Sequence, residues 1–205
     1  FLAGCVGQGQ GEEGGPCGPS GQCFEGLTCL SDLCVDAEPG AQETPRLGLI
    51  CAVADECVYL DSTIGETLTW QGCSAGQMGE SCIGEVEKKS HPDAVTYCEG
   101  LTWGGFDDWV LPNIDELRSL IRGCAKNEYG SSECSVAHQC SYSTNNANTC
   151  GDDYCHGFVS QGGGPGSDGC YWPADLPGTC SGLWSSSLRS SSNAYVVIFF
   201  EALVT

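Results

Sequence analysis

The sequence predicts an α+β protein in which two helices, short antiparallel strands and long disulfide-held loops form the main domain, behind a small disulfide-rich N-terminal module. Three observations support this class. The 205-residue chain contains 17 cysteines and 30 glycines. Residues 90–101 and 113–124 place apolar side chains at helical spacing, and the remaining apolar runs are short and separated by turn-forming residues.

Residues 103–124, WGGFDDWVLPNIDELRSLIRGC, give the clearest local prediction. Asn113 can cap a helix, and Glu116 can accept a hydrogen bond from the amide of that cap residue, which makes a capping box. An apolar face follows at helical spacing: Ile114, Leu117, Leu120, Ile121 and Cys124. Another face carries basic residues and is expected to be a solvated stripe: Arg118, Arg122 and Lys126.

The other elements follow from shorter signals. Ser90 with Asp93 can form a second capping box, with Pro92 tolerated in the first turn of that helix. Short strands are expected at residues 47–53, 57–60, 67–71, 183–187 and 195–204. Residues 125–181 have no sustained periodicity but many Cys, Gly, Ser and Asn, so we expect a long loop region held by disulfides.

The composition limits where the protein can be located and which partners it can bind. This cysteine density indicates an oxidising compartment, so we expect an exported protein outside the cell or on its outer surface. Zinc is disfavoured because no pair of C-x-x-C units is present and histidine is scarce. A formal charge of −20 disfavours nucleic acid, anionic lipid and sulfated polysaccharides as partners. The apolar run at residues 194–200 is too short to span a membrane and predicts a strand.

Residues 1–16 are predicted to be a Gly-rich N-terminal arm. Its first five residues, FLAGC, look like the end of a bacterial lipoprotein signal, in which Cys5 would become the lipid anchor. If residues 1–4 remain in the mature chain, Cys5 is free, paired internally or bridged to another chain. Cys5 is therefore the candidate for an anchor or an intermolecular bond.

Residues 17–34 are predicted to form a small knot with two disulfides, because they contain too few apolar residues for a core. Of the three connectivities, we expect first to third and second to fourth among Cys17, Cys23, Cys29 and Cys34. Residues 35–46 form a polar linker, and residues 47–205 form the main domain.

No catalytic motif is recognisable. The three histidines, His91, His138 and His156, lie in no nucleophile or metal motif, and the serines at 185–187 and 190–192 lack a G-x-S-x-G elbow. We expect a non-enzymatic protein without a cofactor. Calcium is the one metal with candidate ligands, because carboxylates in loops suit it. The weak candidates are Asp152, Asp153 and Asp168, and the alternative is solvated acidic loops.

An ordered series of motifs resembles the Lcl C-terminal domain family of bacterial surface proteins, whose fold is similar to that of C-type lectins. The motifs are LTWQGCSAGQMGESC at residues 68–82, the central run at 103–124, and CYWPADLPGTCSGLWSSS at 170–187. The resemblance covers about residues 47–205. This chain has Val110 where the family usually has Arg, and it stops at Thr205 without the family's further strand carrying Arg and Cys. The family tryptophans Trp103, Trp109, Trp172 and Trp184 are expected in the core or in turns.

The resemblance implies a non-catalytic surface domain. Two functions are considered, and we expect the first because of the N-terminal arm and the missing final strand. In the first, copies of the chain assemble into an extracellular filament: the N-terminal arm docks on the next subunit, and the sheet edge near Thr205 stays unpaired. The alternative is an envelope-anchored adhesin that binds a glycan or protein ligand through its loop-rich surface.

Overall fold

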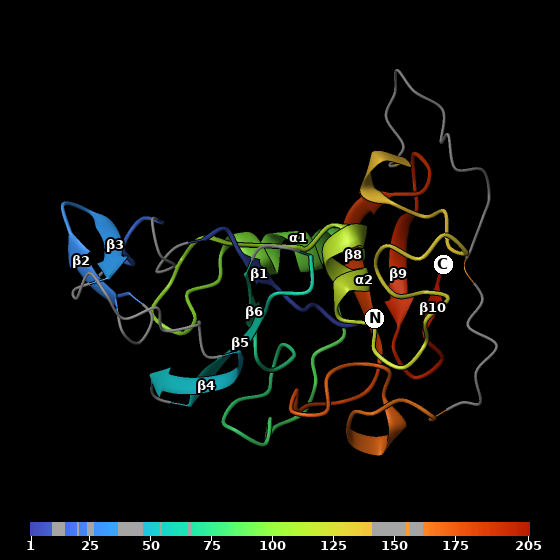
Figure 1. Cartoon of the computed structure of the whole chain (residues 1–205), viewed down its shortest axis with the longest axis horizontal. Coiled ribbons are helices and arrows are strands. Elements are labelled where there is room, and N and C mark those ends of the chain that lie inside the picture. The colour runs from blue at the N-terminus through green and yellow to red at the C-terminus, as the bar shows by residue number, and fades with distance from the viewer. Residues whose placement is uncertain are drawn as a thin grey trace.

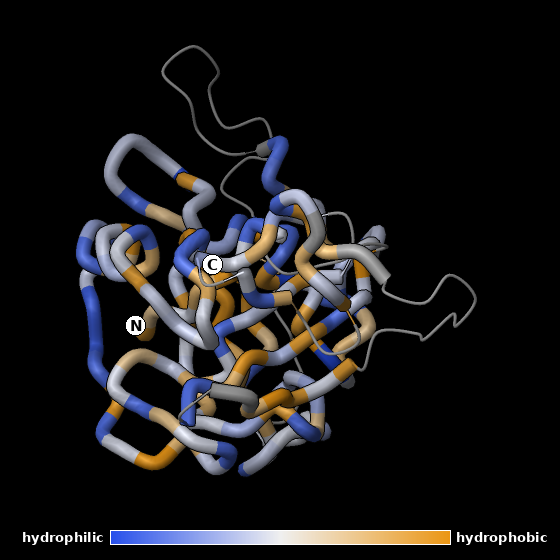
Figure 2. Tube along the Cα trace, turned by 90° about the vertical axis from the view of Figure 1, so that its left-hand side faces the viewer, coloured by the Kyte–Doolittle hydropathy of each residue, from blue (hydrophilic) through white to orange (hydrophobic). Residues whose placement is uncertain are grey.

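The computed structural model describes residues 1–9, 15–19, 21–23, 27–36, 47–53, 55–64, 67–140, 155 and 162–205. Over these residues the protein is α+β, as predicted, with antiparallel sheets of five, three and two strands and two α-helices (Figure 1). Many of the apolar residues lie on segments that cross the middle of the molecule (Figure 2). Asp152, Asp153 and His156 fall outside the described residues.

The five-stranded sheet has the order β4-β5-β6-β1-β7. Its strands are β4 (Gly48–Val53), β5 (Glu56–Asp61), β6 (Leu68–Gln71), β1 (Val6–Gly7) and β7 (Trp109–Val110). The pairing is antiparallel throughout, with Tyr59 opposite Trp70 and Val6 opposite both Trp70 and Val110. A strand from the start of the chain therefore lies between two strands of the main domain.

The N-terminal segment corrects the prediction of an arm over residues 1–16. Leu2 and Val6 are 1% and 0% exposed, and both belong to the main core. The amide of Gln71 donates to the carbonyl of Cys5 at 2.9 Å, and the amide of Leu2 donates to that of Gly182 at 2.9 Å. Residues 1–7 are thus part of the domain, because residues 2–6 are all buried in its interior.

Cys5 also differs from its predicted role. It is fully buried and forms a disulfide with Cys98, with a Cα–Cα distance of 5.5 Å. A buried cysteine bonded within its own chain serves neither as a lipid anchor nor as a bridge to another chain. Of the options that the sequence leaves open, the structure shows internal pairing.

The three-stranded sheet has the order β10-β9-β8, formed by β8 (Gly182–Leu188), β9 (Ala194–Ile198) and β10 (Leu203–Val204). The sequence predicts an unpaired edge near Thr205. Instead, Val204 and Cys155 exchange backbone hydrogen bonds of 3.0 and 3.2 Å on the outer side of β10. The disulfide between Cys134 and Cys155 holds Cys155 in this place.

The two helices begin where the capping signals predict. Helix α1 (His91–Glu99) has Ser90 as its N-cap, and α2 (Ile114–Ser119) has a full capping box between Asn113 and Glu116. Helix α2 is shorter than the apolar periodicity predicts. The chain leaves helical geometry after Leu120, although Ile121 and Cys124 remain buried in the core.

The solvated basic stripe on α2 is a wrong prediction for two of its three members. Arg118 is 3% exposed, and its guanidinium donates to the carbonyls of Asn127, Glu128 and Val136. Burial lowers the pKa of Arg118 from its ordinary value. Arg122 donates to Asp61 Oδ1 at 2.7 Å, whereas Lys126 lies exposed. The buried guanidinium therefore satisfies the carbonyls of the loop that follows the helix.

The small knot has the predicted connectivity. Disulfides join Cys17 to Cys29 and Cys23 to Cys34, around the hairpin of β2 (Leu27–Leu30) and β3 (Leu33–Asp36). The knot packs against the main domain at Gly18, where an added Cβ would lie 3.0 Å from the carbonyl oxygen of Gly105. A glycine is needed there because the two backbones approach so closely.

Disulfides also hold the long loop region, as predicted. Besides Cys134–Cys155, the structure has Cys170–Cys180 here, and η1 (His138–Cys140) and η2 (Ser167–Gly169) are short 3-10 turns. Tyr59 donates to Asp175 Oδ1 at 3.0 Å, which ties this region to β5. Burial, together with that hydrogen bond, raises the pKa of Tyr59. Two further disulfides, Cys51–Cys57 and Cys73–Cys82, close short loops near the five-stranded sheet.

Among the described segments, no helix is both long and apolar enough to cross a membrane.

We predict that removing the Cys5–Cys98 disulfide lowers stability more than removing Cys51–Cys57. The first closes a loop with a sequence separation of 93, the second one of 6. Loop-closure entropy gives losses of about 4–5 and about 2 kcal/mol, respectively. Denaturant unfolding of the double variants Cys5→Ser/Cys98→Ser and Cys51→Ser/Cys57→Ser measures this difference. Equal losses of stability in the two variants would contradict the conclusion that the Cys5–Cys98 disulfide stabilises the N-terminal strand.

We also predict that Arg118→Lys destabilises the protein by about 2–4 kcal/mol, because one ammonium cannot reach three carbonyls and leaves buried acceptors unpaired. The matched control is Lys126→Gln, which removes an exposed charge 3.5 Å from Glu133. Its effect should stay within about 0.5 kcal/mol. Both are measured by denaturant unfolding, and equal effects would argue against the structural role of Arg118.

Candidate functional site

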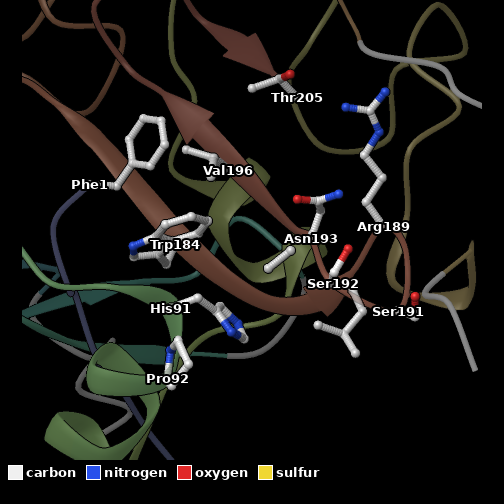
Figure 3. A pocket seen from close by; sticks show the side chains of 12 residues that line it. Phe1, His91, Pro92, Trp184, Arg189, Ser191, Ser192, Asn193, Val196 and Thr205 are labelled. Atoms are coloured by element: carbon white, nitrogen blue, oxygen red, sulfur yellow. The ribbon is translucent and has the colours of Figure 1, made fainter.

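A hollow of about 480 Å³ opens where β8, the turn after it and the start of α1 meet (Figure 3). Residues distant in sequence come together here. The side chains of one wall are aromatic or apolar, and those of the turn are polar. The lining consists of Phe1, His91, Pro92, Trp184, Leu188, Arg189, Ser191, Ser192, Asn193, Ala194, Val196 and Thr205.

Trp184 forms the centre of the aromatic wall. Its ring lies between Phe1 and His91, with edge-on contacts at centroid distances of 5.0 and 5.5 Å (Figure 3). The indole Nε1 donates to the carbonyl of Lys89 at 2.9 Å, which fixes the orientation of the ring. Phe1 is 44% exposed and Trp184 is half-buried. Trp184 thus differs from Trp103, Trp109 and Trp172, which are buried as predicted.

Local capping explains the position of His91. It is the first residue of α1, directly after the N-cap Ser90. Its Nε2 lies 3.0 Å from the carbonyl oxygen of Ser185, a contact that ties the start of the helix to β8. The aromatic wall is therefore fixed by contacts between a helix, a strand and the N-terminal segment.

The turn between β8 and β9 supplies the polar side of the hollow. Ser190 Oγ accepts hydrogen bonds from the amides of Ser192 at 3.3 Å and Asn193 at 3.1 Å. The amide of Arg189 donates to the carbonyl of Asn193 at 2.8 Å and closes the turn. Ser191, Ser192 and Asn193 are exposed. Asn193 Nδ2 also donates to Ser190 Oγ at 3.1 Å, so these bonds close the turn and leave Ser191 and Ser192 exposed.

The charge of the hollow differs from that of the whole chain. The described residues that line it include no aspartate or glutamate, although the sequence has 27 acidic residues against 7 basic ones. One guanidinium, that of Arg189, lies at its rim. The described side chains that line the hollow are therefore mostly uncharged, in contrast to the acidic composition of the whole chain.

A serine–histidine pair lies elsewhere, between η1 and β8: His138 is exposed, and Ser187 is buried. His138 Nδ1 is 2.8 Å from Ser187 Oγ, and the same hydroxyl accepts from the amide of Ile114 at 3.0 Å. Asp115 accepts from the backbone amide of His138 at 3.1 Å rather than from its ring. Because Ser187 is fully buried, the pair has the geometry of a structural contact that fixes the start of α2. Sequence reasoning missed it because its members are 49 residues apart.

Of the three calcium candidates, the structure describes Asp168 alone. Asp168 is an exposed residue within η2 at a φ of 55°, and Asp152 and Asp153 lie outside the described residues. In the described part of the chain, the one group with metal-ligand spacing is Cys17, Cys23 and Cys34. All three sulfurs are in disulfides, so this group is explained by the knot.

A comparison with family models matches residues 61–205 to the Lcl C-terminal domain. The match covers more than half of the chain and includes both helices, β8 and the turn that forms the hollow. Searches among curated proteins and among solved structures find no match.

We predict that Trp184 supplies most of the tryptophan fluorescence that acrylamide can quench. The other four tryptophans, Trp70, Trp103, Trp109 and Trp172, are each no more than 8% exposed. Replacing Trp184 with Phe should therefore remove most of the accessible fraction. Trp172→Phe is the matched control and should leave that fraction almost unchanged. Equal quenching of the two variants would show that the hollow is closed in solution.

Proposed function

Because the chain belongs to the Lcl C-terminal domain family, which is associated with cell surfaces, we propose that it is a non-enzymatic binding module displayed outside the cell. In this proposal it acts as an adhesin whose ligand docks in the hollow beside β8. The observation that carries the proposal is the open, partly aromatic hollow held by Trp184 and the ordered turn after β8. Largely preformed concave sites of this kind are typical of ligand binding.

The covalent framework supports an extracellular location. Seven disulfides join described cysteines, and such a number is compatible with an oxidising environment. A free, buried thiol occurs at Cys124 among the described cysteines. The proposed adhesin would gain resistance to unfolding and proteolysis from these bonds.

The proposal includes a C-type-lectin-like fold for residues 47–205. Two helices and antiparallel sheets with long, disulfide-held loops support it. Attachment to the envelope does not follow from Cys5, because that sulfur is bonded to Cys98. In this proposal the ligand is a glycan or a surface protein.

Assembly into a filament is the second candidate, and one observation favours it. Strand β4 lies at the edge of the five-stranded sheet and, within the described residues, pairs with β5 alone. An edge strand of this length can accept a strand from another copy. The filament hypothesis from the sequence depended on a free N-terminal arm and on an unpaired sheet edge near Thr205. Both now support it less, because residues 1–7 pack in their own domain and Cys155 pairs with Val204.

We predict that the purified protein binds a subset of an array of immobilised glycans and extracellular proteins, and that Trp184→Ala lowers this binding about tenfold. The substitution removes the central ring of the hollow. Lys126→Gln, an exposed change outside the hollow, is the control and should bind like the unaltered protein. Binding that is the same for all three proteins would overturn the proposed site. An absence of binding together with regular filaments in electron micrographs would favour the second candidate.

A further inference from the structure

We infer that the hollow beside β8 is a calcium-independent site for a neutral sugar. This inference rests on the proposed function and names the ligand class of the same site. It depends on three properties of the hollow: an aromatic wall, an ordered set of hydroxyl and amide groups, and a lining without carboxylate side chains among the described residues.

The aromatic wall matches the apolar face of a pyranose ring. Trp184 is half-buried and fixed by its hydrogen bond to Lys89, and Phe1 is 44% exposed beside it. A ring held in place by the protein loses little conformational entropy on binding, so more of the contact energy appears as affinity. Tryptophan combines a large apolar surface with a rigid shape, which suits contact with the C–H groups of a sugar.

The polar side matches sugar hydroxyls. Ser191, Ser192 and Asn193 are exposed on a turn that Ser190 holds through its own hydroxyl. Hydroxyl and amide groups both donate and accept hydrogen bonds, as sugar hydroxyls do. Arg189 also lines the hollow, and a guanidinium is a hydrogen-bond donor. Figure 3 shows Phe1, Trp184 and His91 on one side of the hollow and the residues of the turn on the other, with the guanidinium of Arg189 directed away from Trp184.

The charges distinguish this site from a calcium-bridged one. Calcium requires several oxygen ligands, commonly carboxylates, and the described lining residues provide none from Asp or Glu side chains. A charge of −20 on the whole chain repels polyanions during their approach. A neutral sugar encounters neither difficulty. We therefore expect direct contacts between the sugar and protein side chains.

The test is a titration of the full chain with neutral tetrasaccharides (maltotetraose, cellotetraose and mannotetraose) and with tetragalacturonate as the carboxylated probe. Tryptophan fluorescence and calorimetry report binding, each in calcium chloride and in EDTA. We expect at least one neutral tetrasaccharide to bind with the same affinity in both buffers. Trp184→Ala should weaken that affinity about tenfold, or about 1.4 kcal/mol. Ser192→Ala should weaken it severalfold, and Lys126→Gln should not change it.

Trp184→Phe keeps an aromatic ring at this position, so it provides a second variant for the test if the alanine variant does not fold. It should retain affinity within severalfold. The inference is overturned if binding requires calcium, if tetragalacturonate alone binds, or if Trp184→Ala binds the sugar normally. If no tetrasaccharide binds but a protein ligand binds in a Trp184-dependent way, the sugar inference fails and the proposed function stands. If all binding is independent of Trp184, both fail.

Discussion

The insertion of residues 1–7 between elements of the main domain is the constraint on which the rest of the structure depends. Strand β1 pairs with β6 on one side and with β7 on the other, so that without it the five-stranded sheet would be in two parts. The same segment reaches the second sheet, where the amide of Trp184 donates to the carbonyl of Leu2 at 3.3 Å. The disulfide from Cys5 to Cys98 joins it to α1. One short segment thus connects the five-stranded sheet, the three-stranded sheet and a helix, and Phe1 at its start contributes to the wall of the hollow.

Disulfides stabilise a chain that has little regular secondary structure and a large net negative charge. Long stretches carry few apolar residues, and a charge of −20 favours expansion through self-repulsion. Disulfides reduce the entropy of the unfolded chain without requiring a large core. Buried polar contacts serve the same loops: Arg118 satisfies three carbonyls, and Asn127 donates to the carbonyl of Cys155 at 3.0 Å. The loop region is therefore held by specific bonds at defined points.

Sequence reasoning predicted the features that depend on neighbouring residues. The capping box of Asn113 and Glu116 and the buried face of α2 follow from local spacing. The expected pairing within the knot is also found, although spacing alone left three connectivities open. It failed where the deciding contact is distant. The Gly-rich context of residues 1–7 is typical of a linker, and nothing in it indicates a partner in β6 or β7. Periodicity placed Arg118 on a polar face but could not show that a later loop covers that face. The hollow is formed by Phe1, His91 and the 189–193 turn, which are distant in sequence, so no local pattern predicts it. The one sequence feature that could have indicated it is the group of serines at 190–192 after an apolar strand.

The hollow also shows why net charge is a weak guide to what a particular site binds. In solution at physiological ionic strength, exposed charges interact over about 8 Å, so carboxylates beyond that distance act on the approach of a ligand more than on its bound state. In the proposed site, a ligand would meet the side chains that line the hollow, among them an indole ring and serine hydroxyls. Under this proposal the acidic surface disfavours the approach of polyanions, and the local groups discriminate among the other ligands. Specificity would then depend on Trp184 and the turn after β8, both of which form hydrogen bonds within the protein.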